Sequence, residues 1–201
     1  MPDLILGFDT SAAHCAAALL SGDRLLARRA EAMTRGQAER LMPMLEEMLS
    51  GCGAGWRELA ALGVGIGPGN FTGIRIAVSA ARGLALGLGI PAVGVDGFEA
   101  RAALAPAPAL LAIPGPSGQV HLRDPEAPGD AARMMPQQEA LALARQRGVP
   151  LAAEPDPQDL AESIARISAA RWRSVTEPPA PLYARAADAA PSRDAPPVLL
   201  D

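Results

Sequence analysis

The stretch Gly65-Ile-Gly-Pro-Gly-Asn-Phe-Thr-Gly-Ile-Arg75 decides how this chain is expected to fold. The apolar run Leu62–Ile66 leads into it and predicts a strand, and the long apolar run behind it predicts a helix over Ile74–Leu88. The sequence therefore predicts a strand that turns tightly into a helix. The turn itself comprises Gly67, Pro68, Gly69, Asn70, Phe71, Thr72, Gly73 and Arg75.

The residue types in this turn suit two different purposes. Gly67 and Gly69 permit positive φ or a close backbone approach, while Asn70 and Thr72 are good helix N-caps. Free N–H groups at such a helix start attract anions. The stretch is not a dinucleotide-binding fingerprint, because Asn70 stands where the third glycine belongs, and no Gly-Lys follows as in a phosphate-binding P-loop. A tight turn without a ligand is an equal alternative.

The residues around the turn predict a mixed sheet. Short connections between the first three predicted strands favour an antiparallel meander, since a parallel crossover needs a dozen or more residues. The period then changes to a helical one, with Pro43 inside the helical pattern and a predicted kink there. The predicted strands are 3–9, 15–20, 25–32, 62–66 and 91–95, and the predicted helices are 38–52, 74–88 and 98–104.

The second half of the chain carries a weaker pattern. We expect a first lobe over residues 1–105, a shortened second lobe over 106–180 and a Pro-rich tail over 181–201. In the second lobe we expect a hairpin of 109–113 and 119–123, a loop at 124–130, helices at 137–147 and 159–171, and a short strand at 150–153. The fold class is therefore α/β.

Composition excludes several kinds of chemistry. All 18 basic residues are Arg, so lysine-dependent catalysis is impossible. The two His are not spaced as in a zinc protease, and two Cys are too few for a zinc ribbon or a disulfide scaffold. The formal charge of −4 argues against a stand-alone nucleic-acid-binding protein. The N-terminus lacks a basic signal-peptide region, and Arg82 interrupts the longest apolar run, so we expect a cytoplasmic protein that does not contact a membrane.

Two predicted helices have little polar surface. The helix over 74–88 is apolar nearly all round, and the one over 38–52 has a broad Met-rich stripe. Such helices lie either in the core or against another protein, and the sequence leaves both open. The interface candidates are Leu41, Met42, Leu45, Met48, Ile74, Val78, Ala81, Arg82 and Ala85.

Candidate chemical groups are few. Asp9-Thr10-Ser11 ends the first predicted strand and resembles the phosphate and metal loop of actin-like ATPases. The candidates for cofactor binding are therefore Asp9, Thr10, Ser11, Gly67 and Gly69, although ATP binding is doubtful, and we identify no metal or catalytic residue. Adjacent strand residues face opposite ways, so His14 and Cys15 do not predict a nucleophile–base pair.

The chain resembles the TsaB (YeaZ) family. The resemblance rests on Asp9-Thr10-Ser11, on the stretch 37–49, on 65–85 and 91–96, and on the tail Pro181-Leu182-Tyr183-x-Arg185. It is dense over 3–105 and thin afterwards. Asn70 replaces the Ser or Thr of the family motif. Pro114-Gly115-Pro116 stands where the family usually has an Asp-Ala-Arg-type turn, so the roles of that turn do not carry over.

The resemblance implies an actin-like, RNase-H-like fold of two βββαβα lobes, the second one shortened here. It also implies a non-catalytic partner of the TsaD transferase, with the ATPase TsaE as a third component. Together they make N6-threonylcarbamoyladenosine at position 37 of tRNAs that read codons beginning with A. We expect a homodimer when the chain is alone and contact with tRNA only through the complex. The alternatives are an autonomous actin-like phosphotransferase and, less favoured, a glycoprotease-like peptidase.

Overall fold

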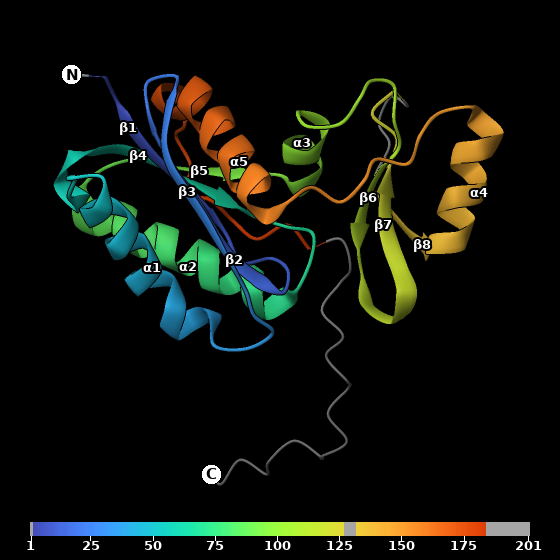
Figure 1. The fold of residues 1–201 in the computed structure, drawn as a ribbon, viewed down its shortest axis with the longest axis horizontal. Helices are drawn as coiled ribbons and strands as arrows, with labels where there is room; N and C mark the ends of the chain where they lie inside the picture. The colour runs from blue at the N-terminus through green and yellow to red at the C-terminus, as the bar shows by residue number, and fades with distance from the viewer. Residues whose placement is uncertain (1, 127–131, 184–201) are drawn as a thin grey trace, which may run out of the picture.

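The computed structural model describes residues 2–126 and 132–183. Figure 1 shows a larger α/β lobe, in which helices cover both faces of a central sheet, beside a smaller lobe of one sheet and one helix. The α/β class and the division into a full lobe and a reduced one agree with the expected fold.

The central sheet has five strands in the order β3-β2-β1-β4-β5. β1, β2 and β3 form the expected antiparallel meander, while β4 and β5 run parallel to β1. Parallel strands have their carboxyl ends on the same side of the sheet. Asp9 at the end of β1 therefore lies on the same side as Gly65 at the end of β4. The bounds are β1 Leu4–Asp9, β2 His14–Ser21, β3 Arg24–Ala32, β4 Leu59–Gly65 and β5 Ala92–Val95.

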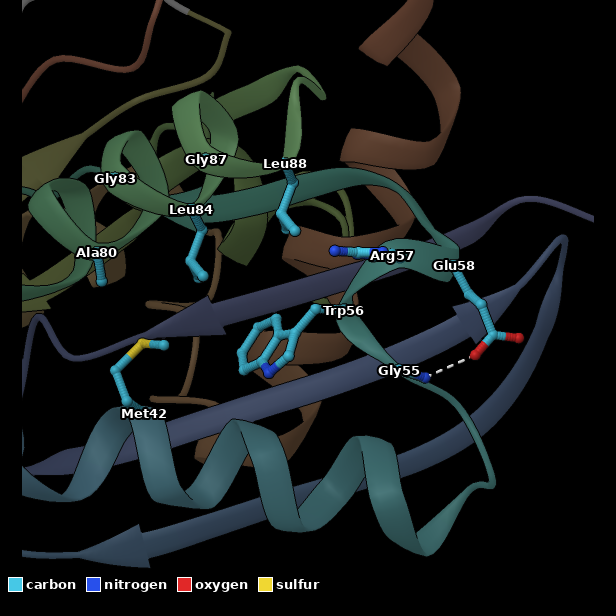
Figure 2. A pocket seen from close by; sticks show the side chains of 10 residues that line it. All are labelled: Met42, Gly55, Trp56, Arg57, Glu58, Ala80, Gly83, Leu84, Gly87 and Leu88. Carbon is cyan, nitrogen blue, oxygen red and sulfur yellow. Dashed lines mark hydrogen bonds between the residues drawn. The ribbon is translucent and has the colours of Figure 1, made fainter.

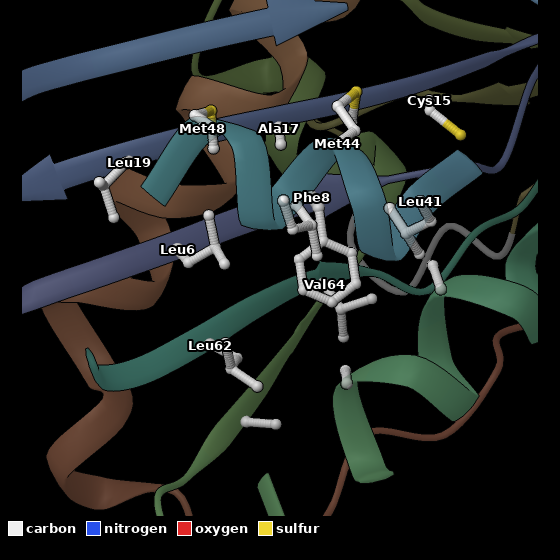
Figure 3. Close-up of a cluster of buried hydrophobic side chains, with 14 of the residues drawn as sticks. Leu6, Phe8, Cys15, Ala17, Leu19, Leu41, Met44, Met48, Leu62 and Val64 are labelled. Carbon is white, nitrogen blue, oxygen red and sulfur yellow. The ribbon is translucent and has the colours of Figure 1, made fainter. Parts of the chain in front are cut away.

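Helices α1 (Gln37–Gly51) and α2 (Phe71–Leu88) cover one face of this sheet. Alternate strand residues such as Leu6 and Phe8 point toward them and form the main core (Figure 3). α1 runs through Pro43 as a single helix. α2 begins three residues before its predicted start, because the turn residues Phe71–Gly73 are already helical.

The opposite face is covered by α5 (Pro157–Arg171). The helix lies close to the strands because the strands carry glycines and the helix carries small residues there. A Cβ on Gly7 would lie 2.7 Å from Ala165 Cβ, and one on Gly63 would lie 2.9 Å from Ser168 Cβ. The assignment of residues 106–180 to one separate lobe is therefore wrong for α5.

The smaller lobe has three strands in the order β6-β7-β8, with α4 packed on one face. The hairpin of β6 and β7 is as predicted. β8 was not predicted, because Arg133–Pro136 has only four residues and no alternating pattern. The predicted strand at 150–153 is reduced to one parallel bridge between Leu151 and Leu110. The bounds are α3 Gly97–Ala102, β6 Leu111–Pro114, β7 Gln119–Arg123, β8 Arg133–Pro136 and α4 Gln137–Arg147.

Three short 3-10 helices complete the described chain: η1 Trp56–Glu58, η2 Pro116–Gly118 and η3 Trp172–Ser174. Most of the predicted loop at 124–130 and most of the predicted tail, from residue 184 onward, lie outside the described residues.

Among the described residues, α2 alone is long and apolar enough to cross a membrane by length and composition. Core helices of globular proteins have the same character. Ile74, Ala77 and Ala81 of α2 are buried in the core, and 28% of the apolar window is buried within the chain.

The close approach of α5 gives a first prediction. We expect Gly63→Ala to lower the free energy of unfolding by about 1–3 kcal/mol, the usual cost of overpacking a core. A new Cβ there would also come within 3.1 Å of the Ile164 carbonyl oxygen. Urea denaturation measures the change.

Gly83→Ala is the matched control. No atom lies within 4 Å of a Cβ built at this helical position. Alanine should therefore stabilise α2, by up to about 1 kcal/mol. Equal effects of the two substitutions would contradict the tight contact between β4 and α5.

Candidate functional site

The end of β1 is joined directly to the start of α2, and we call this contact the β1–α2 joint (Asp9–Ser11 with Gly67–Gly73). The Thr10 hydroxyl donates to the Gly73 carbonyl at 2.6 Å, and the Asn70 N–H donates to the Ser11 carbonyl at 2.7 Å. The Asn70 side chain caps α2 by accepting from the Gly73 N–H at 2.8 Å. Two segments about 60 residues apart in sequence are thus fixed to each other.

The glycines of the turn are required by this contact. Gly67 and Gly69 have φ of 98° and 156°, which L side chains rarely adopt. A Cβ on Gly69 would lie 3.2 Å from Ser11 Cβ and overlap the Ser11 carbonyl oxygen, and one on Gly73 would overlap the Thr10 carbonyl oxygen. The turn is therefore shaped by the backbone of β1.

The Asp9 carboxylate is buried and already bound by its neighbours. Its Oδ2 accepts from the Ser11 N–H, from the Ser11 hydroxyl and from His14 Nε2, each at 2.9 Å. Burial alone would raise the pKa of Asp9, but the hydrogen bonds and the charge of His14, together with the Ser11 bonds, hold that pKa below its usual value. Asp9 stays ionised as a structural acceptor.

The residues proposed for cofactor binding come together in the structure, but their polar groups are used internally. Asp9 and Ser11 bind each other, Thr10 binds Gly73, and the N–H of Asn70 binds the end of β1. Engaged in this way, these groups are less available to a phosphate, which binds N–H donors, or to a magnesium ion, which binds oxygen ligands. Among the described residues, no three His, Cys, Asp or Glu side chains gather as a metal site.

His14 and Cys15 face opposite sides of β2, as the alternation of a strand requires. His14 binds Asp9, whereas the Cys15 thiol lies 3.7 Å from Met33 Sδ in the core below α1. Burial raises the pKa of the Cys15 thiol to about 11, so it is a poor nucleophile near neutral pH.

The outer sides of α1 and α2 form a groove of about 780 Å³ together with η1. Met42 reaches in from α1, Leu84 and Leu88 from α2, and the Trp56 ring lies between the helices (Figure 2). Ala80, Gly83 and Gly87 of α2 also line the groove, and their small side chains do not fill it. The groove is mainly apolar, with Arg57 and Glu58 also among its lining residues.

The predicted interface residues are divided by the structure. Six of them are buried in the chain's own core and cannot contact a partner: Leu41, Leu45, Met48, Ile74, Val78 and Ala81. Met42 is 38% exposed, Arg82 is exposed and Ala85 is half-buried. Helical spacing identifies the most apolar side of each helix, and that side packs on the sheet. For this reason most of the predicted interface residues are core residues.

The groove residues that sequence analysis missed are Trp56 of η1 and Leu84 and Leu88 of α2. Ala80, Gly83 and Gly87 of α2, small residues that permit close helix packing, also line the groove. The signal was the excess of small and apolar residues on α2 beyond one stripe, together with a tryptophan placed just after α1.

Comparison with known proteins gives the family. The model of the family described as TsaD, tRNA N6-adenosine threonylcarbamoyltransferase, matches residues 29–179. The chain is 38% identical over 92 residues to the tRNA threonylcarbamoyladenosine biosynthesis protein TsaB of Escherichia coli, covering 46% of this chain and 39% of that protein. Identity to the TsaB protein of Haemophilus influenzae is 36% over 99 residues, covering 49% of this chain and 41% of that one.

Among solved structures, YeaZ from Pseudomonas aeruginosa superposes with a TM-score of 0.68 at 26% identity, covering 90% of this chain and 99% of that one. A second Pseudomonas aeruginosa structure, of an uncharacterized protein with similarity to peptidase YEAZ, gives 0.69 at 24% identity over 91% of this chain and all of that one. The fold is thus shared almost throughout, although the chain matches only about two fifths of the length of the two named TsaB proteins.

The glycine turn gives a second prediction. We expect Gly69→Ala and Gly73→Ala each to destabilise the fold by at least about 1 kcal/mol, because each new Cβ meets the backbone of β1. Gly67→Ala should act in the same direction, since a Cβ there would lie 2.6 Å from Ile74 Cδ1. Thermal denaturation measures the loss.

Asn70→Ser is the control, because serine is a comparable N-cap. Its melting temperature should stay close to that of the unmodified chain. Glycine variants that melt like the unmodified chain would show that the β1–α2 joint does not constrain the turn.

Proposed function

The chain belongs to the protein family described by the TsaD model, and on that premise we propose that it is a TsaB-type subunit of a complex that makes N6-threonylcarbamoyladenosine in tRNA. In this proposal it is not catalytic itself and binds a TsaD-like transferase, with a TsaE-like ATPase as third component. The product is formed on adenosine 37 of tRNAs that read codons beginning with A, and this chain meets tRNA only through the complex, in the cytoplasm.

The observation that carries the proposal is the groove between α1 and α2. Apolar surface of this kind is usually covered by a partner. Met42 and Leu84 supply large apolar side chains, and Gly83 and Gly87 allow a partner helix to approach closely. Leu86 on the outward side of α2 is 88% exposed and extends the apolar surface beyond the groove.

The absence of catalysis by this chain alone is supported by the β1–α2 joint. The Ser11 hydroxyl donates to Asp9 and His14 binds the same carboxylate oxygen, so serine and histidine are both partners of Asp9 rather than of each other. A serine nucleophile needs a base within hydrogen-bond reach of its hydroxyl. This arrangement suits a structural joint better than a peptidase or transferase site.

The groove gives a third prediction. We expect Met42→Glu to fold normally and to weaken binding of the TsaD-like subunit at least about 100-fold, because an unpaired carboxylate would be buried only in the complex and costs about 3 kcal/mol or more there. Isothermal titration with the purified subunit measures the affinity. The isolated chain should be a dimer at tens of micromolar, and the same substitution should make it monomeric in light scattering.

Leu141→Glu is the matched control, since Leu141 is 39% exposed on α4 and Met42 is 38% exposed on α1. It adds the same charge at the same exposure and should leave binding and self-association unchanged. Ala81→Glu should instead prevent folding, because Ala81 is fully buried in the core. Equal binding by Met42→Glu and Leu141→Glu would exclude the groove as the partner surface.

A fourth prediction separates the proposal from its alternative, an autonomous actin-like phosphotransferase. The isolated chain should show no tight binding of Mg²⁺-ATP by calorimetry, because Asp9 Oδ2 and the Asn70 N–H bind within the chain. An ATP complex of micromolar affinity that is lost in Asp9→Asn would favour the phosphotransferase.

A further inference from the structure

The residues after η3, Val175–Tyr183, run back across the molecule, and we call them the clip. In Figure 1 this red segment returns from α5 toward the start of α2. It passes the edge of the central sheet at β5, where a Cβ on Gly94 would lie 3.3 Å from Pro179 Cβ. The Leu182 N–H then donates to the Ile66 carbonyl at 2.7 Å. The clip is thus bound to the last residue before the glycine turn.

The end of the clip also binds two residues in the first turns of α2, Phe71 and Arg75. The Tyr183 and Phe71 rings lie 4.9 Å apart between centroids, and Arg75 Nε donates to the Tyr183 hydroxyl at 2.9 Å. The Arg75 guanidinium lies 3.8 Å from the centre of the Phe71 ring, which adds a cation–π contact. The clip therefore bridges the two ends of the turn, one through a backbone bond and one through side chains.

The turn and the clip also touch at Gly67. A Cβ built on Gly67 would lie 2.9 Å from the Leu182 carbonyl oxygen. The glycine is thus needed on two sides, by its own positive φ and by the backbone of the clip. Pro178, Pro179 and Pro181 restrict the backbone of the clip before it binds, which lowers the conformational entropy lost on ordering it.

Farther along α2, the helix and the clip line a common cavity. Arg82 and Leu86 of α2 line a cavity of about 530 Å³ whose opposite wall includes Glu177 and Pro178. At 100° per residue, Arg75, Arg82 and Leu86 fall on one outward stripe of α2. The stripe that the clip touches is next to the α2 side that lines the partner groove.

We infer that the clip holds the first turn of α2 in place and thereby sets the affinity of the α1–α2 groove for its partner, an inference that rests on the proposed function of that groove. The Tyr183, Phe71 and Arg75 side chains are the positioning residues. The clip, although it comes about a hundred residues later in the sequence, would then influence how tightly the groove formed by residues 42–88 binds its partner.

The test uses two substitutions at one position of the full chain. Leu182→Pro removes the N–H that binds Ile66, whereas Leu182→Ala shortens the side chain and keeps the N–H. Tyr183→Ala, at a residue that is 40% exposed, removes the ring contact without touching the core. Two readouts are taken: amide hydrogen exchange at Gly73 and Ile74, and affinity for the TsaD-like subunit.

We expect Leu182→Pro and Tyr183→Ala to speed exchange at Gly73 and Ile74 by about five- to tenfold, the equivalent of one hydrogen bond. Exchange at Leu19 in β2 should be unchanged. Affinity for the partner should fall by at most the same factor, because affinity follows the fraction of molecules in the binding-competent conformation. Leu182→Ala should behave like the unmodified chain in both readouts.

Unchanged exchange in both variants would overturn the inference, as would faster exchange with unchanged affinity. Equal effects of Leu182→Pro and Leu182→Ala would show that the Leu182 side chain causes the effect. The hydrogen bond from the Leu182 N–H to Ile66 would then play no part in holding the turn. If the unmodified chain does not bind the partner at all, the proposed function fails, and hydrogen exchange then decides whether the clip holds the turn.

Discussion

The hydrogen bonds between the end of β1 and the start of α2 are the constraint on which the rest of the structure depends. Thr10 and Ser11 are bound to Gly73 and Asn70, so the central strand and the longest helix meet at a fixed angle. The same contact places Ser11 to bind Asp9, and it leaves room only for glycine at positions 69 and 73. A motif that looks like an anion-binding loop thus has a structural reason: the Asn70 N–H is bound by the Ser11 carbonyl, and the Gly73 N–H is bound by the Asn70 side chain.

Local sequence was a good guide where one segment decides its own structure. The meander, the turn at 67–73 and the hairpin of the smaller lobe were all predicted, because alternation and turn residues act within a few positions. The position of α5 could not be predicted in this way. Its contact with the first lobe depends on pairs such as Gly7 with Ala165 and Gly63 with Ser168, more than 100 residues apart. Small residues on a strand and on a distant helix carry no local signal that they belong together.

The candidate site was predicted at the level of its elements but not of its side chains. The turn and the two apolar helices were identified correctly as the unusual features, yet most of the predicted interface residues are core residues. A period of 3.6 residues shows that a helix has an apolar face, and it does not show which of two apolar faces lies on the sheet. On α1 the distinction is between Leu41 and its neighbour Met42, one buried and one exposed. Only the packing of the helix on the sheet separates them.

The all-round apolarity of α2 follows from the three surfaces that the helix meets. Ile74, Ala77 and Ala81 face the core, while Ala80, Leu84 and Leu88 face the groove. The outward stripe with Leu86 borders the cavity beside the clip. Its hydropathy is high enough for a membrane span because apolar residues occupy both the side that faces the core and the side that faces the groove. Arg75 and Arg82, its two charges, both lie on the outward stripe, where water can reach them.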